Sequence, residues 1–201
     1  LKKYVQLIND QHPDIILLAG DICDRSLKPL MHQKMNEELE NLNARLGVYA
    51  IPGNHEYYSE NLQKTLQFYE DAGIKVLTDS VSLIDKSFYV VGRKDRMDKS
   101  RAKLSTILSS LATDKPIILL DHQPSALEEA IQNNVDLQIS GHTHEGQVFP
   151  ANLLVKGMFE AGYGYFKKKN THLYVSSGLG LWGPPYRIGT QSEIVVIHFK
   201  Y

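Results

Sequence analysis

The chain has 201 residues, of which 42% are hydrophobic and 22% charged, and its formal net charge is −1. This is the composition of an ordinary globular protein, and it argues against a dedicated duplex-binding protein, which would carry a basic stripe. No apolar run approaches the roughly 18 residues that are needed to span a bilayer. The single cysteine, Cys23, excludes an internal disulfide and a cysteine-rich zinc site.

The first half of the chain alternates between helical and apolar strand patterns. Proline and glycine mark several boundaries: Pro13 closes the first helix, Pro29 opens the second, and Gly73 ends the third, whose expected N-cap is Ser59. In chain order we expect a helix at 1–11, a strand at 14–20, a helix at 29–46, a strand at 47–53, a helix at 59–73 and a meander of short strands at 75–79, 81–85 and 87–93.

The second half continues the alternation. In chain order we expect a helix around 100–111, a strand at 115–122, a helix around 125–133, a strand at 135–140, an irregular amphipathic stretch after Pro150, a strand at 172–178, a loop rich in glycine and proline, and a final strand at 193–199. Apolar strands separated by helices indicate a sheet that is buried on both faces, and hence a layered α/β protein. With no repeat or linker along the chain, residues 1–201 are predicted to form a single domain.

Side chains that bind metals follow four of the expected strands. They are Asp21 and Asp24 after the first strand, Asn54, His55 and Glu56 after the second, His122 at the end of 115–122, and His142 and His144 after 135–140. Ligands of layered α/β folds bind outside the carboxyl ends of the strands, so these side chains should share one rim. In an extended backbone two histidines two residues apart point to the same side. Mixed carboxylate, amide and imidazole groups suit manganese, iron or zinc.

The segments GDICDR, GNHE, DH and GHTHEGQ, in this order between residues 20 and 147, resemble the motifs of the calcineurin-like metallophosphoesterases. The resemblance implies a layered α/β/β/α fold, in which a central sheet sandwich is flanked by helices. It also implies two divalent metal ions in the complete protein, with manganese favoured over zinc or iron. The implied ligands are Asp21 as the bridge between the metals, Asn54, His122 and His142 for one metal, and His144 for the other.

The same resemblance makes His55 the general acid and Asp24 the carboxylate that orients it. The chemistry agrees with these roles independently. Two cations roughly 3.5–4 Å apart polarise a phosphoryl oxygen and turn a bridging water into hydroxide at neutral pH. The departing oxygen then needs a proton, which His55 can supply while its neighbour Asn54 holds metal.

One departure from the family pattern affects the second metal. The family opens with a strand that carries Asp-x-His, and nothing before Asp21 matches it, because Asp10 and His12 lie in the helical segment that Pro13 closes. We expect the chain to lack its natural N-terminal start. Only Asp21 and His144 would then remain at the second metal, and hydrolysis by the chain as given is in doubt.

Several residues are candidates for substrate binding. Arg25 matches an arginine that holds substrate phosphate in the protein phosphatase branch, although capping of the next helix is an equal alternative. Arg93, in the segment GRKDR, either reaches the substrate or belongs to a solvated loop. Trp182 and Arg187 lie in GLGLWGPPYRIG, which resembles the closing loop of the bacterial membrane-associated branch, and are expected to line the pocket.

Residues 149–169 combine large apolar side chains with Lys167, Lys168 and Lys169. This combination fits a surface that leans on an anionic bilayer or grips a lipid tail. The alternative is a core helix followed by a hairpin with a charged turn. On the resemblance we expect a bacterial protein, held at a membrane through segments of the missing N-terminal part.

The predicted function is metal-dependent hydrolysis of a phosphomonoester or pyrophosphate bond in a phosphorylated small molecule or a lipid of the cell envelope. A membrane surface is a further expected partner, and neither a nucleic acid nor an obligate protein partner is expected. Two alternatives share the fold. A non-catalytic scaffold has no use for His55, and a nuclease would need the basic stripe that the chain lacks.

Overall fold

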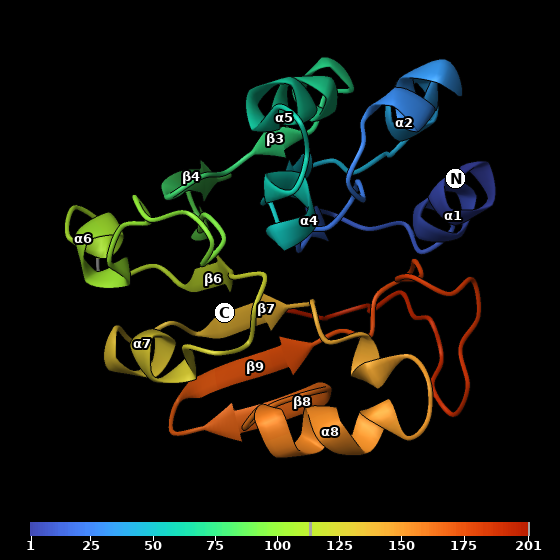
Figure 1. The fold of residues 1–201 in the computed structure, drawn as a ribbon. Coiled ribbons are helices and arrows are strands. Elements are labelled where there is room, and N and C mark those ends of the chain that lie inside the picture. The colour runs from blue at the N-terminus through green and yellow to red at the C-terminus, as the bar shows by residue number, and fades with distance from the viewer. Residues whose placement is uncertain (113, 201) are drawn as a thin grey trace.

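The computed structural model describes residues 1–112 and 114–200. Two sheets face each other, one of order β1-β2-β3 and one of order β4-β5-β6-β7-β9-β8. In Figure 1 the first sheet lies above with α1, α2 and α5, and the strands β6, β7, β9 and β8 lie below with α7 and α8.

The elements follow in chain order: α1 (Lys2–Asn9), β1 (Ile16–Leu18), α2 (Lys28–His32), α3 (Met35–Leu39), β2 (Val48–Ala50), α4 (Asn54–Tyr57), α5 (Leu62–Asp71), β3 (Lys75–Val76), β4 (Ser80–Ile84), β5 (Phe88–Gly92), α6 (Leu104–Leu108), β6 (Ile117–Leu120), α7 (Leu127–Gln132), β7 (Leu137–Ser140), the 3₁₀ turn η1 (His144–Gly146), α8 (Ala151–Met158), β8 (Gly164–Lys168) and β9 (Thr171–Val175).

Alternating side chains of the strands build the layers. On β5, Phe88 and Val90 pack between the two sheets, whereas Tyr89 and Val91 face α6 and α7. The other face of the first sheet packs against α3 and α5 through a cluster that includes the fully buried Tyr69. The order helix, sheet, sheet, helix confirms the predicted layered α/β fold.

Parallel pairing brings the ends of the strands together. β1, β2 and β3 are parallel, and so are β5, β6, β7 and β9, while β4 and β8 are antiparallel edge strands. The carboxyl ends of β1, β2, β6 and β7 therefore carry the metal-binding motifs, as predicted. No helix in the described ranges is both long and apolar enough to cross a bilayer.

The predicted helix at 29–46 is wrong as a single element. Two short helices, α2 and α3, replace it, because Lys34 adopts a left-handed backbone with φ of 50°. The break lets Leu30 and Met35 reach the same core as Leu39. The helix predicted at 59–73 corresponds to α5, which begins at Leu62 and not near Ser59. Asn61 is its N-cap, since the Asn61 side chain accepts a hydrogen bond from the Lys64 amide at 3.0 Å.

Three further expectations near the sheets need correction. β3 pairs with β2 in the first sheet, so the expected meander reduces to the β4–β5 hairpin. The stretch after Pro150 is not irregular: it forms α8 and β8, and β8 pairs with β9. The final strand at 193–199 is absent from residues 191–200, where Glu193 instead accepts a hydrogen bond from the Ser177 amide.

Candidate metal centre

Four predicted ligands meet at the rim formed by the strand ends. Asp21, His122 and His142 offer ligand atoms that all lie within 4.8 Å of one another. Asn54 lies among them, with its Oδ1 3.1 Å from His122 Nε2 and 2.8 Å from His142 Nδ1. These side chains follow β1, β2, β6 and β7, so they are far apart in sequence and are brought together by the parallel strands.

The contacts of His122 show that this cluster fits a cation. Its Nδ1 lies 2.7 Å from the Ala19 carbonyl, which can only accept, so Nδ1 carries the proton. In the neutral ring Nε2 is then a lone pair, and it faces Asp21 Oδ2 at 3.0 Å as well as Asn54 Oδ1. Acceptors that face one another need a positive charge between them. A divalent metal that favours nitrogen and oxygen ligands meets this need.

The pKa shifts of Asp21, His122 and His142 arise from burial and from the contacts within this cluster. Burial alone would lower the pKa of His122, but the Asp21 carboxylate more than offsets burial and raises it. Burial raises the pKa of Asp21, but the contact with His122 outweighs burial, so the pKa of Asp21 is lowered overall. Burial and the charge of His122 lower the pKa of His142. A proton on His122 thus supplies the positive charge next to Asp21, and a metal bound there would displace that proton, whereas the lowered pKa of His142 favours the neutral ring that a metal requires.

Glu56 holds the loops that carry Asp21 and Asn54. Its side chain is fully buried and accepts hydrogen bonds from the backbone amides of Asp21, Ile22, Cys23 and Gly53 at 2.8–3.0 Å. The Tyr69 hydroxyl donates a fifth bond at 2.8 Å. Burial and the neighbouring Asp21 raise the pKa of Glu56, and the bonds from Cys23, Gly53 and Tyr69 oppose this rise.

The loops approach so closely that Gly53 has no room for a side chain. A Cβ at this position would lie 2.2 Å from Asp21 Oδ1. Glycine is therefore required before Asn54, because any side chain would displace the Asp21 carboxylate from the cluster.

His55 stands beside the ligands and does not join them. Its Nδ1 lies 2.6 Å from Asp24 Oδ1, and its backbone amide donates to Asp21 Oδ1 at 2.9 Å. The ring packs edge-on against Tyr58, with the centroids 5.5 Å apart. Asp24 thus fixes the orientation of the imidazole, in the arrangement predicted for a proton donor and its orienting carboxylate.

The backbone of the second histidine pair differs from the prediction. β7 ends at Ser140, and both His142 and His144 have a left-handed backbone, with φ of 70° and 50°. The two imidazoles therefore do not leave one extended strand on the same face. His144 lines the same cavity but is outside the cluster of mutually close ligand atoms among the described residues. Burial and the charge of Arg187 lower the pKa of His144 to about 4, so the ring is neutral at pH 7.

Sequence analysis missed the role of Gln147, although it belongs to the GHTHEGQ motif. This buried side chain accepts from the Trp182 amide at 2.6 Å and donates to the carbonyls of Trp182 and Pro184 at 2.5 and 3.0 Å. Such a closed set of bonds fixes the loop that carries Trp182. A glutamine in a motif of histidines and glycines is the signal that could have indicated this role.

A cavity of about 770 Å³ opens over the cluster. Its polar end is formed by Asp21, Asn54, His142 and His144 with His55. Arg25 also lines it, with its guanidinium 6.0 Å from the Tyr58 ring centroid. Its apolar wall comes from α8 and the C-terminal loop. The wall residues are Ala151, Leu154, Val155, Met158 and Trp182. Arg25 and Trp182 therefore line the cavity, and their contact with a substrate stays a prediction.

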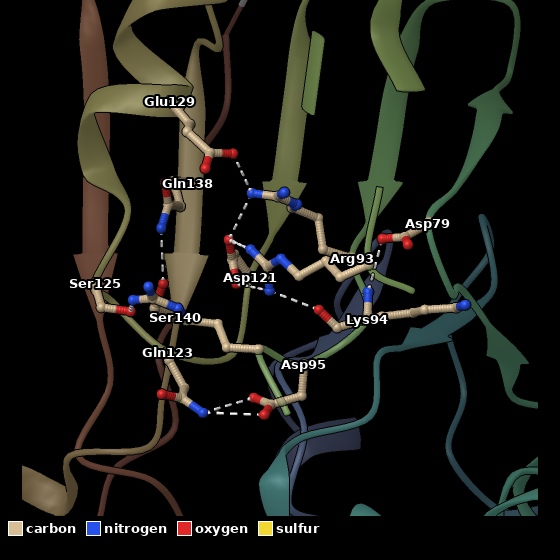
Figure 2. Close-up of polar contacts among 12 residues, drawn as sticks. Asp79, Arg93, Lys94, Asp95, Asp121, Gln123, Ser125, Glu129, Gln138 and Ser140 are labelled. Atoms are coloured by element: carbon tan, nitrogen blue, oxygen red, sulfur yellow. Dashed lines mark hydrogen bonds and ion pairs between the residues drawn. The ribbon is translucent and has the colours of Figure 1, made fainter. Parts of the chain in front are cut away.

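The other two predicted substrate residues are placed differently. The Arg187 guanidinium is turned toward the protein, where it donates to the carbonyls of His144, Ser177 and Gly180 at 2.7–3.0 Å. Arg93 is 2% exposed and lies behind β6, bonded to Asp121 and Glu129 at 3.3 and 2.7 Å (Figure 2). Neither lines the cavity. Their predicted place at the substrate is therefore wrong, because both guanidinium groups are held by the protein itself, Arg93 in a buried site and Arg187 in a half-buried one.

Comparisons with known proteins agree with this geometry. The family described as calcineurin-like phosphoesterase matches residues 1–146. The chain is 30% identical over 215 residues to a Danio rerio protein named "Transmembrane protein with metallophosphoesterase domain", covering 100% of the chain and 49% of that protein. It is 34% identical over 198 residues to an uncharacterized metallophosphoesterase of Aquifex aeolicus, covering 94% and 74% of the two.

The crystal structure of TT1561 from Thermus thermophilus has a similar fold, with a TM-score of 0.53 at 14% identity. The similarity covers 87% of this chain and 81% of that one. The chain spans about half the length of several curated relatives that it matches.

Proposed function

The chain belongs to the calcineurin-like phosphoesterase family, and we propose that it is the hydrolytic domain of a metal-dependent phosphoesterase that cleaves a phosphomonoester or pyrophosphate bond. The observation that carries the proposal is the meeting of Asp21, Asn54, His122 and His142 next to the His55–Asp24 pair. A scaffold would need no such pair, because neither member supports the packing of the core.

Asp21, Asn54, His122 and His142 would hold one divalent cation, and Asp21 with His144 would contribute to a second. Manganese is the favoured metal, with zinc or iron as alternatives, since the ligands mix hard oxygens with imidazole. A bound cation of this kind supplies Lewis-acid polarisation of a phosphoryl oxygen. The neutral state of His142 and His144 keeps their lone pairs free for this purpose.

His55 would protonate the leaving oxygen. Its Nδ1 is committed to Asp24, so a protonated ring presents its second proton on Nε2. The ring lines the cavity, where a substrate would lie. The Asp24 carboxylate lies 2.6 Å from Nδ1 and so keeps the opposite edge of the ring turned to the cavity.

The test compares substrates with good and poor leaving groups in protein loaded with manganese. His55→Ala should keep its metal content and lose about 10²–10⁴-fold in turnover of an alkyl phosphate, with a much smaller loss on p-nitrophenyl phosphate, which needs no proton. Asp24→Asn should also lose more turnover on the alkyl phosphate than on p-nitrophenyl phosphate, but both losses should be smaller than those of His55→Ala. Equal losses on both substrates would refute the role of His55, and a wild-type protein that binds no divalent metal would refute the proposed function.

We further propose that the substrate is an amphiphilic phosphate, such as a lipid of the cell envelope, and that the protein works at a membrane surface. The apolar wall of the cavity supports this. α8 has no buried residue, and Leu154 and Met158 are 66% and 75% exposed beside the polar end of the cavity. Each acyl CH₂ that such a wall buries contributes about 0.8 kcal/mol.

The basic part of this surface is smaller than the sequence suggested. Lys168 is paired with Glu128 and Glu160 at 2.5 and 2.6 Å, so two carboxylates offset its charge. The exposed side chains of Lys156, Lys167 and Lys169 remain. Electrostatic attraction to a membrane should therefore be secondary to apolar contact.

The ratio of turnover on a lipid phosphate to turnover on its deacylated head group tests this preference. Leu154→Gln with Met158→Gln should lower the ratio and weaken sedimentation with liposomes. Leu83→Gln, which alters a leucine of β4 that is 47% exposed and outside the cavity, is the matched control. If the double variant changes neither quantity, the amphiphilic substrate is excluded while metal-dependent hydrolysis stands.

A further inference from the structure

Three consecutive residues after β6 are held by three separate sets of partners. His122 faces the metal cluster, whereas Asp121 and Gln123 bond to the segment between β5 and α6 (Figure 2). β6 ends at Leu120 and the backbone bends at His122 and Gln123, so these side chains, and not a regular strand, determine how the three residues are held. The metal-facing side of His122 and the anchored side of its neighbours are therefore parts of one rigid strand end.

Asp121 is fixed by two arginines. Its carboxylate is 2% exposed and accepts from Arg101 Nη1 and Nη2 at 3.1 and 2.5 Å and from Arg93 Nη1 at 3.3 Å. Arg93 also donates to Glu129 of α7 at 2.7 Å. Two guanidinium groups thus enclose one buried carboxylate, and its position is determined from two directions.

Gln123 is fixed by a buried carboxylate. Its Nε2 donates to both carboxylate oxygens of Asp95 at 3.0 Å, and Asp95 is completely buried. Asp95 also accepts from the amide of Met97 at 3.0 Å, so the carboxylate is itself held in place. The anchor therefore does not depend on an exposed, mobile side chain.

The segment that provides these anchors is tied at both ends. Asp79 accepts from the amides of Lys94 and Ala102 at 3.0 and 2.7 Å, which closes the segment into a loop (Figure 2). The Arg93 guanidinium donates to the Ala102 carbonyl at 2.8 Å across the same loop. Such a closed loop can act as a rigid support.

The geometry points to a positioning role: we propose that Arg93, Asp95 and Arg101, here called the clamp, hold the metal ligand His122 in place from behind β6. The proposal rests on the proposed metal centre. Main-chain bonds fix the strand end in the plane of the sheet, because Asp121 N donates to the Ile139 carbonyl and Gly141 N to the His122 carbonyl. The clamp adds the constraint perpendicular to the sheet.

A purely stabilising role explains these charges poorly. Burying ion pairs carries a desolvation penalty that often exceeds their attraction, and apolar residues of similar size would pack as well. The clamp residues contact the residues on either side of a metal ligand, where small shifts would move His122 Nε2 relative to Asp21 and Asn54. Groups that orient a ligand typically affect metal affinity by about 10–100-fold.

The experiment measures the affinity of the full chain for Mn²⁺ and the absorption of the Co²⁺-loaded protein. Asp121→Asn and Arg101→Met should each weaken Mn²⁺ binding by about 10–100-fold and change the Co²⁺ d–d bands, which report ligand geometry. Arg101→Lys should restore part of the affinity, since an ammonium can give Asp121 one charged donor. Gln123→Ala removes an uncharged group and provides a test if Asp121→Asn does not fold. Lys99→Met changes an exposed lysine of the same loop and is the control.

A loss of Mn²⁺ affinity in folded Arg101→Met and Gln123→Ala, with normal affinity in Lys99→Met, would support the clamp. Variants that melt earlier but bind Mn²⁺ and absorb with Co²⁺ like the wild type would show that the network only stabilises the fold, and would overturn it. A wild-type chain that binds neither ion would overturn the metal centre and the clamp together. These results are distinct, so failure of the clamp is separable from failure of the proposed function.

Discussion

Replacing Glu56 by glutamine tests how the metal centre is built without altering any ligand. The two oxygens of Glu56 have different partners. Oε1 accepts from the amides of Ile22 and Cys23 and from the Tyr69 hydroxyl, and Oε2 accepts from the amides of Asp21 and Gly53. All five partners are donors. An amide group at either position therefore turns two or three hydrogen bonds into contacts between donors.

The smaller loss occurs if the amide nitrogen replaces Oε2, which leaves two buried N–H groups without an acceptor. Each such group costs about 1–3 kcal/mol, so the gross cost is about 2–6 kcal/mol. Removing the buried charge of Glu56 offsets part of this free-energy cost, because burial and Asp21 already raise the pKa of Glu56. We expect a net loss of about 2–4 kcal/mol, which lowers Tm by about 4–16 °C in a protein of this size.

The assay is thermal unfolding of the full chain, followed by circular dichroism with a chelator present so that bound metal does not contribute. Glu60→Gln is the matched control, because Glu60 makes only an exposed ion pair with Lys28 at 3.1 Å. Its Tm should stay within about 2 °C of the wild type. If Glu56→Gln melts like this control, the five bonds do not hold the loops and the reasoning fails.

Three further predictions follow from individual contacts. Cys23 is buried and its pKa is raised to about 11, mainly by burial, so iodoacetamide at pH 8 should label it only after unfolding; labelling of the folded chain at the unfolded rate would contradict this. Gln147→Ala should free the loop of Trp182, the only tryptophan, and its fluorescence should shift to the red and become more accessible to acrylamide, with an unchanged spectrum as the contrary result. Mn²⁺ at 100 times its Kd should stabilise the wild type by about 2.7 kcal/mol, an effect that Asp21→Asn should abolish; equal stabilisation of both would exclude the proposed ligand set.

The sequence was most informative where the main chain alone determines position. Asp21, Asn54, His122 and His142 were predicted to meet because each follows an apolar strand, and the carboxyl ends of parallel strands lie at one edge. That prediction needs no knowledge of side-chain partners. The layered fold was predictable for the same reason, since continuous apolar strands imply helices on both outer faces.

Predictions failed where a distant partner decides the outcome. Arg93 follows a strand, as the ligands do, but its partners Asp121 and Glu129 are 28 and 36 residues away, and their direction is not visible in the local pattern. The helix expected at 29–46 contains no proline or glycine after Pro29 that would break it, and the left-handed backbone of Lys34 depends on the core that both halves reach. Local propensity gives no warning of either case.

The metal ligands and the side chains that hold their loops in place occupy different kinds of position in the sequence. The loops that carry Asp21, Asn54 and His122 are held by polar side chains that are buried, that ligate no metal themselves and that lie within two residues of a ligand. Glu56 is two residues from Asn54, and Asp121 is one from His122. Because a cation attracts any oxygen or nitrogen nearby, the loops must be rigid before it binds, or the wrong atoms would reach it. Polar residues close to predicted ligands in the sequence are therefore candidates for buried side chains that hold the site in place. A sequence can indicate these residues together with the ligands.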